Sequence, residues 1–90
     1  MLEKVKLALR IKTTAFDNEI DDLIKAALAD LQIAGVSTEE DALIIRAVIT
    51  YCKANFGEPE NADRWKAAYD EQKAQLQVAT GYTDWGETDG

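Results

Sequence analysis

Residues 42–52 read Ala-Leu-Ile-Ile-Arg-Ala-Val-Ile-Thr-Tyr-Cys, and this stretch decides the fold of the chain. The polar residues Arg46 and Thr50 interrupt this apolar stretch, and Lys53 follows it. Because they are spaced four and three residues apart, all three lie on one stripe of a helix. The other faces of such a helix are apolar, so further elements must cover them. The stretch therefore predicts the central helix of an all-α domain.

Start and stop signals flank this central helix. Ser37 and Glu40 have the spacing of a capping box, in which both side chains bond free backbone amides at a helix start. Phe56 and Gly57 follow the last apolar positions, and glycine is common just beyond a helix end. The sequence thus predicts a helix that is capped by Ser37 and ends near Asn55.

A shorter periodic segment opens the chain. Residues 2–11 carry Leu2, Val5 and Leu9 on one face and predict a short amphipathic helix. The basic side chains of this helix are expected to point mostly outward; they are Lys4, Lys6 and Arg10.

A second predicted helix follows, and Asp17 is expected to cap it. Its apolar positions recur at helical spacing. They are Ile20, Leu23, Ile24, Ala27, Leu28 and Leu31. Asp21 and Lys25 have the spacing of a favourable ion pair, and Gly35 stands where a left-handed residue ends a helix.

The last periodic segment runs from a cap at Asn61 to about Val78. Trp65 and Tyr69 are one turn apart on its inner face, and we expect them to be core residues rather than a ligand cage. Beyond Ala79 no periodicity remains. The sequence therefore predicts a small bundle of about four helices over residues 1–78, followed by an extended acidic C-terminal tail over residues 79–90.

Composition argues against several functions. The formal net charge is −7, and an acidic protein gains nothing from displacing phosphate counterions, so specific nucleic-acid binding is disfavoured. The chain has no histidine and one cysteine, which removes the usual general base of a catalytic triad and the ligand set of a zinc site. Its five glycines form no phosphate-binding loop. We expect no catalytic, cofactor-binding or metal-binding residues.

Other features concern the cell compartment. Cys52 lies among apolar residues and is expected to be an inert core thiol. The longest apolar runs fall far short of the ~20 residues of a membrane span, and the N-terminal segment lacks the apolar stretch of a signal peptide. We expect no membrane association and a protein that is made, and acts, in the cytoplasm.

Charge is unevenly distributed along the chain. Residues 1–12 hold four bases and one acid, a balance of +3, whereas residues 13–45 hold eight acids and one base, a balance of −7. Contact between the two segments is favoured, within one chain or between neighbouring copies, although solvated helix faces explain the pattern equally well. The candidate interface residues here are Lys4, Lys6, Arg10, Asp17, Asp21 and Asp22.

Three further residues are candidates for protein contacts. Arg46, a lone cation in the most apolar helix, either extends into solvent or forms a buried or interfacial ion pair. Tyr82 and Trp85 lie in a short segment too small for a core of its own, and large aromatic side chains normally need a surface to cover. They fold back on their own bundle, insert into another subunit or partner, or remain disordered.

The order of these segments resembles a known family. The relevant stretches are Leu-Glu-Lys-Val-Lys-Leu-Ala-Leu-Arg-Ile (2–11), Asp-Asn-Glu-Ile-Asp-Asp-Leu-Ile-Lys-Ala-Ala (17–27), Leu-Ile-Ile-Arg-Ala-Val-Ile-Thr-Tyr-Cys-Lys-Ala-Asn-Phe-Gly (43–57) and Arg-Trp-Lys-Ala-Ala-Tyr-Asp-Glu-Gln-Lys-Ala-Gln-Leu (64–76). Together they resemble the head–tail connector proteins, also called head-completion or DNA-packaging proteins, of long-tailed bacteriophages and prophages.

This resemblance implies a structural virion protein without enzymatic activity. A ring of about a dozen copies, joined head to tail, would sit beneath the portal protein and extend the DNA channel. It would offer a docking surface to a tail-side head-completion protein, and DNA would pass through without specific binding. The protein would be found in the virion and in the host bacterial cytoplasm. The alternative function is a small helical adaptor or regulator that binds one protein partner through Tyr82 and Trp85.

Overall fold

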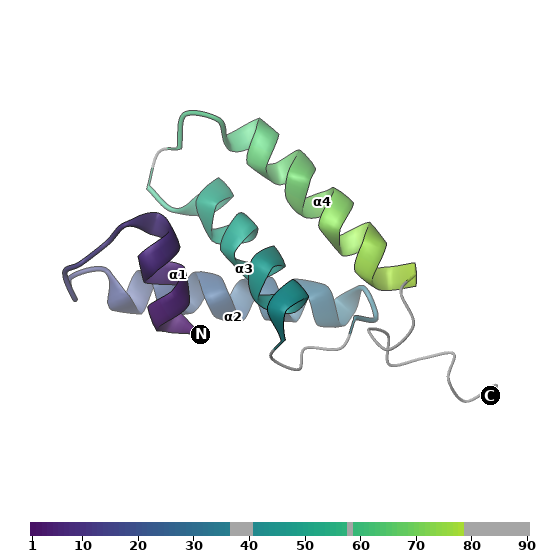
Figure 1. Ribbon diagram of the computed structural model, residues 1–90, viewed down its shortest axis with the longest axis horizontal. Coiled ribbons are helices and arrows are strands. Elements are labelled where there is room, and N and C mark those ends of the chain that lie inside the picture. Colours follow the sequence, from purple (N-terminus) through teal and green to yellow (C-terminus); the bar gives the residue numbers. More distant parts are fainter. Residues whose placement is uncertain (37–40, 58, 79–90) are drawn as a thin grey trace.

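The computed structural model describes residues 1–36, 41–57 and 59–78, which form four α-helices (Figure 1). The helices are α1 (Leu2–Leu9), α2 (Asp17–Ile33), α3 (Ala42–Asn55) and α4 (Ala62–Val78). The described ranges contain no strand. The prediction of an all-α fold with about four helices is confirmed.

Helix α3 is the central element, as its sequence predicted. It packs against each of the other three helices. Figure 1 shows it crossing α2, with α4 running alongside. Ile44, Val48 and Cys52, each one turn from the next, are completely buried in its inner face. They join a core that also contains side chains of α1, α2 and α4.

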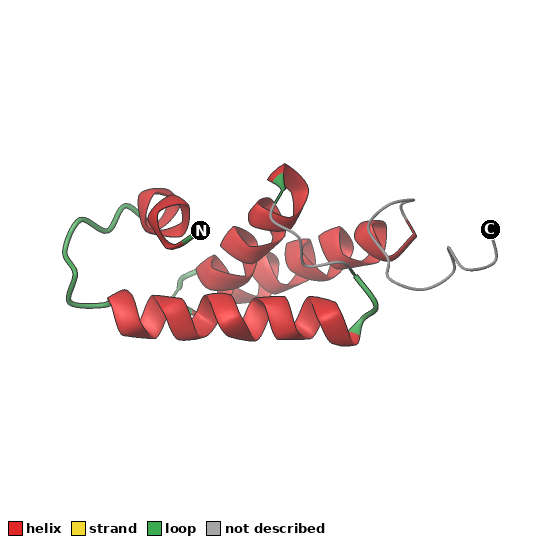
Figure 2. Cartoon of the chain, turned by 90° about the horizontal axis from the view of Figure 1, so that it is seen from below, coloured by secondary structure: helices red, strands yellow, loops and turns green. Residues whose placement is uncertain are grey.

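Helix α2 supplies the opposite wall of this core. Its fully buried or nearly buried positions are Ile20, Ile24, Ala27 and Leu31, which follow the predicted stripe. Figure 2 shows α2 lying along the molecule, with α1 seen almost end-on near the N-terminal half of α2. Val5 anchors α1 in the core and is completely buried.

Two helix starts differ from the prediction. The side chain of Asp41 caps α3, and its Oδ1 accepts hydrogen bonds from the amides of Leu43 (2.9 Å) and Ile44 (3.1 Å). Ser37 is therefore not the cap of this helix, and it lies with Glu40 outside the described residues. The prediction of Asp17 as a cap is also wrong, because Phe16 holds the cap position of α2 and Asp17 is already helical. Aspartate is favourable both at a cap and in the first turn, so sequence alone does not separate the two positions.

Two helix ends share one arrangement of backbone hydrogen bonds. After α2, the amides of Gly35 and Val36 donate to the carbonyls of Gln32 (3.0 Å) and Leu31 (2.9 Å), with Gly35 at φ 85°. This is a Schellman motif, and it confirms the role predicted for Gly35. After α1 the same pattern recurs, but Arg10 takes the left-handed position, at φ 61°.

Replacement of Arg10 by glycine is expected to stabilise the fold by about 0.5–1 kcal/mol. A side chain at positive φ is disfavoured by roughly 1–2 kcal/mol, of which glycine returns a part through its greater freedom in the unfolded chain. Urea unfolding followed by circular dichroism measures the change. Gly35→Ala is the matched control, because it introduces a side chain at the equivalent position of α2 and should change stability in the opposite direction. If both substitutions changed the free energy of unfolding in the same direction, the left-handed conformation of Arg10 would be contradicted.

Cys52 occupies the core as predicted. The residue is completely buried, and burial raises the pKa of its thiol to about 12. Because the thiolate is the reactive form, this environment keeps the side chain chemically inert.

Candidate assembly surfaces

Lys6 and Asp17 join α1 to the first turn of α2. The Lys6 Nζ lies 2.8 Å from Asp17 Oδ1, and the two side chains are only 9% and 31% exposed. Oδ1 has no well-aligned hydrogen-bond donor among the described residues, so the contact is an ion pair more than a directed hydrogen bond. The expectation that Lys6 points outward is therefore wrong, because its apolar stem is buried beside Val5 and only the ammonium reaches the carboxylate.

The other two basic interface candidates of this segment are exposed: Lys4 on α1, and Arg10 in the turn that follows it. Lys4, Leu7 and Arg10 are each three residues apart, and all three are exposed. Leu7 is 79% exposed, which is unusual for a large apolar side chain. We call these three residues the α1 outer face. It combines two cations with an apolar side chain between them.

Helix α2 presents an acidic counterpart. Its exposed stripe, here called the α2 outer stripe, consists of Glu19, Asp22, Ala26, Ala29 and Ile33. Ile33 is 86% exposed. Asp21 lies next to this stripe and pairs with Lys25 at 3.0 Å, as predicted, and this contact raises the pKa of Lys25 through its hydrogen bond to Asp21. Of the predicted acidic interface residues, Asp22 is exposed, whereas Asp17 and Asp21 are engaged within the chain.

The polar stripe predicted for α3 is only partly exposed. Arg46 is exposed and forms no ion pair with the described residues. Thr50 is buried, and its hydroxyl donates to the Arg46 carbonyl at 3.0 Å. Lys53 lies over the ring of Trp65, 4.8 Å from its centre. Arg46 therefore has no ion pair within the described part of the chain, and an ion pair with a neighbouring copy stays a prediction.

Arg46 borders a hollow between α3 and α4, which we call the α3–α4 groove. Its volume is about 440 Å³. The residues that line it are Leu43, Arg46, Ala68, Glu71, Gln72, Gln75 and Leu76. Half of the surface of Leu43 is exposed there.

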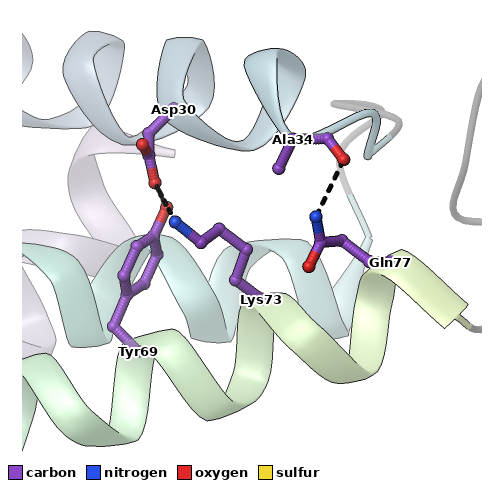
Figure 3. A network of polar contacts seen from close by, with 5 residues as sticks. All are labelled: Asp30, Ala34, Tyr69, Lys73 and Gln77. Carbon is purple, nitrogen blue, oxygen red and sulfur yellow. Dashed lines mark hydrogen bonds and ion pairs between the residues drawn. The ribbon is translucent and has the colours of Figure 1, made fainter.

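A polar network that no sequence pattern predicts connects α4 to α2 (Figure 3). The Tyr69 hydroxyl donates to Asp30 Oδ2 at 2.7 Å, and Lys73 Nζ lies 3.1 Å from the same oxygen. One turn further, Gln77 Nε2 donates to the Ala34 carbonyl at 3.1 Å. Residues 69, 73 and 77 are four apart, so they share one face of α4.

The network changes the acid–base behaviour of its members. Partial burial opposes the ionisation of Asp30, but the hydrogen bonds from Tyr69 and Lys73 outweigh it and lower the pKa of this carboxyl below its ordinary value of 3.8. Burial, together with the hydrogen bond to Asp30, raises the pKa of the Tyr69 hydroxyl, which stays protonated and acts as a donor. The fold thus holds Asp30 as an ionised acceptor.

Asp30→Asn is expected to lower the free energy of unfolding by roughly 1 kcal/mol at neutral pH, because Asp30 is partly exposed and its charged contacts are screened. The Asp30 carboxyl has a folded-state pKa below its ordinary value of 3.8, so its contribution to stability is complete above that ordinary value and is lost as the pH falls through the lower folded-state pKa. Urea titrations at pH 6 and pH 3 should show a smaller loss of stability in the variant than in the wild type. Asp22→Asn, at an exposed position, should leave the pH dependence of stability unchanged. If it reduced this pH dependence as much as Asp30→Asn does, the role of Asp30 would be contradicted.

The remaining predicted interface residues, Tyr82 and Trp85, lie outside the described residues.

Within residues 1–36, 41–57 and 59–78, no group of three or more His, Cys, Asp or Glu side chains is placed to hold a metal ion. In the same ranges, none of the helices has the length and apolar character needed to cross a membrane.

Comparison with models of known protein families identifies a family that the chain matches. A family model described as "Phage connector protein" matches residues 1–83, which include all four helices and Tyr82 but end before Trp85. No curated protein and no solved structure shows significant similarity to the chain.

Proposed function

Because the chain belongs to the phage connector protein family, we propose that it is a structural subunit of the virion that forms a ring beneath the portal protein. About a dozen copies close this ring, which extends the DNA channel and docks the tail-side head-completion protein. The family match over residues 1–83 is the observation that carries this proposal. Membership of a structural family implies a role in assembly rather than catalysis.

The exposed surfaces of α1 and α2 support self-association of the head-to-tail kind. A ring of identical subunits requires two different patches that fit each other. The α1 outer face offers Lys4 and Arg10 around Leu7, and the α2 outer stripe offers Glu19 and Asp22 beside small residues and an exposed isoleucine. Opposite charge sets the register of two such surfaces, and the apolar positions supply buried area.

The charge of the chain supports passage of DNA. With a net charge of −7, the subunit as a whole repels phosphate, which favours the passage of DNA along a wall of these subunits without adhesion. Specific recognition of DNA is not part of the proposed function. The partners are further copies of the chain, the portal protein and a tail-side protein.

Deletion of the gene from the phage or prophage that encodes this chain tests the proposal. We expect filled or leaking heads and separate, complete tails in electron micrographs, with few joined particles. Supply of the wild-type gene in trans should restore joined virions and place the protein in purified particles by mass spectrometry. Normal virions in the absence of the gene, or virions that lack the protein, would contradict a connector role.

A further inference from the structure

Three side chains of the α3–α4 groove lack the contacts that their chemistry favours. Leu43 is 50% exposed. Arg46 is exposed and has no ion pair with the described residues. The Gln72 Oε1 atom is buried and finds no hydrogen-bond donor in the part of the chain that the structure describes. A buried oxygen without a donor is rare in proteins and destabilising.

These three deficits define the group that would complete the groove. It must cover an apolar side chain, present an electron-rich face to a guanidinium, and donate one hydrogen bond. An indole ring does all three, since tryptophan is the best aromatic partner for a cation and its ring nitrogen is a donor only. The volume of about 440 Å³ lies in the range of sites that hold a group of this size.

We propose that the α3–α4 groove is the docking site of the chain's own Trp85. In this arrangement the indole N–H donates to Gln72 Oε1, and the ring packs on Leu43 and on the guanidinium of Arg46. The proposal concerns the free subunit and does not depend on the proposed connector function.

The geometry of the chain allows this arrangement. Residue 79 follows directly on Val78, the last residue of α4, and the groove lies along residues 68–76 of the same helix. Ala68 is ten residues before Val78, a distance of about 15 Å along the helix axis at 1.5 Å per residue. Trp85 is seven residues beyond Val78 and can reach about 23 Å at 3.3 Å per residue. Gly81 permits the reversal of direction that the return path requires.

Charge also favours the tail as the occupant. Residues 79–90 contain Asp84, Glu87 and Asp89 and no basic residue. Asp84 adjoins Trp85 in the sequence, so docking of the indole brings a carboxylate close to Arg46. Glu71, which also lines the groove, repels these acids and weakens the attraction. Glu71→Gln should therefore strengthen docking.

The same chain is a better source of this tryptophan than a second copy. A short connection within one chain gives an effective concentration on the order of millimolar, far above the concentration of free subunits in dilute solution. Docking within one chain should therefore be independent of protein concentration.

Nuclear magnetic resonance of the full chain carrying Trp65→Phe tests the proposal. Trp85 is then the sole tryptophan, and circular dichroism checks that the helices remain. We expect an indole N–H signal that is shifted from that of the free peptide 79–90 and exchanges more slowly with water. If Trp65→Phe does not fold, Trp85→Phe identifies the same signal by its loss from the wild-type spectrum.

Variants of the groove give the decisive comparison. Arg46→Ala should lower the ratio of docked to free Trp85 about five- to tenfold, the scale of a cation–π contact at a partly exposed site. Arg64→Ala, an exposed arginine of α4 that does not line the groove, is the matched control and should change nothing. An indole signal like that of the free peptide, or protection that disappears on dilution, would overturn the proposal; the second outcome would place Trp85 in a neighbouring copy.

Discussion

Lys6→Glu is expected to lower the free energy of unfolding by about 3 kcal/mol. The substitution removes a cation that is 9% exposed and places a second carboxylate beside Asp17. Loss of one partner from a buried ion pair costs roughly 3–5 kcal/mol, and the partial exposure of Asp17 reduces this figure toward its lower end. For a domain of this size the melting temperature should fall by roughly 12–24 °C.

Two companion variants isolate the ion pair from general effects of charge. Lys4→Glu makes the same change of charge on the exposed side of α1 and should alter stability by less than about 0.5 kcal/mol. The exchange Lys6→Glu with Asp17→Lys should recover part of the loss, which a double-mutant cycle measures. Urea unfolding followed by circular dichroism is measured for the wild type, for Lys4→Glu, and for the three variants of the cycle: Lys6→Glu, Asp17→Lys and the double variant. Equal losses for Lys4→Glu and Lys6→Glu would show that Lys6 is not a structural residue.

Reversal of charge on the α1 outer face should weaken self-association by about 30-fold. Lys4→Glu with Arg10→Glu turns two attractions with the α2 outer stripe of the next copy into repulsions, and each changed contact contributes on the order of 1 kcal/mol at a solvent-exposed rim. The variant should remain folded, because Lys4 and Arg10 are exposed and neither takes part in an ion pair within the described residues. Native mass spectrometry across a range of protein concentrations measures the loss of oligomers.

A complementary variant makes this test specific to the proposed pair of surfaces. Glu19→Lys with Asp22→Lys should also fail to associate with itself, since both of its surfaces are then basic. A mixture of the two variants should assemble, because the reversed α1 face of one fits the reversed α2 stripe of the other. Failure of the mixture to assemble, while each variant remains folded, would rule out this pairing of surfaces.

Short-range patterns predicted most of the fold. Apolar spacing alone located α2 and the central α3, and Gly35 was recognised because a positive φ at a helix end has a local signature. The sequence predicts too early a start for α3, because Ser37 and Asp41 are both good caps and only the backbone path selects one of them. It also predicts Lys6 on the outer side of α1, because the sequence does not show that this long side chain can bury its stem and still reach a carboxylate on another helix.

Long-range contacts between polar side chains were beyond prediction. Asp30 and Tyr69 are 39 residues apart, and nothing near either of them indicates that they share a hydrogen bond. The same is true of the α3–α4 groove, which depends on the angle between two helices as well as on their sequences. Of the nine predicted interface residues, Tyr82 and Trp85 lie outside the described residues. Among the other seven, Lys6 and Asp17 pair with each other and Asp21 pairs with Lys25. The four that are exposed in the described part of the chain are Lys4, Arg10, Asp22 and Arg46.

The left-handed backbone of Arg10 has a meaning for encounters between subunits. Two backbone hydrogen bonds hold the turn that contains Arg10. The direction of its Cα–Cβ bond is therefore fixed in the free subunit, before another copy binds. In the proposed interface, a preorganised cation loses less conformational entropy on contact than one on a mobile loop. The same residue would then carry backbone strain in the isolated subunit and a preorganised contact for assembly. Glycine at this position would raise the stability of the monomer and lower its affinity for neighbouring copies.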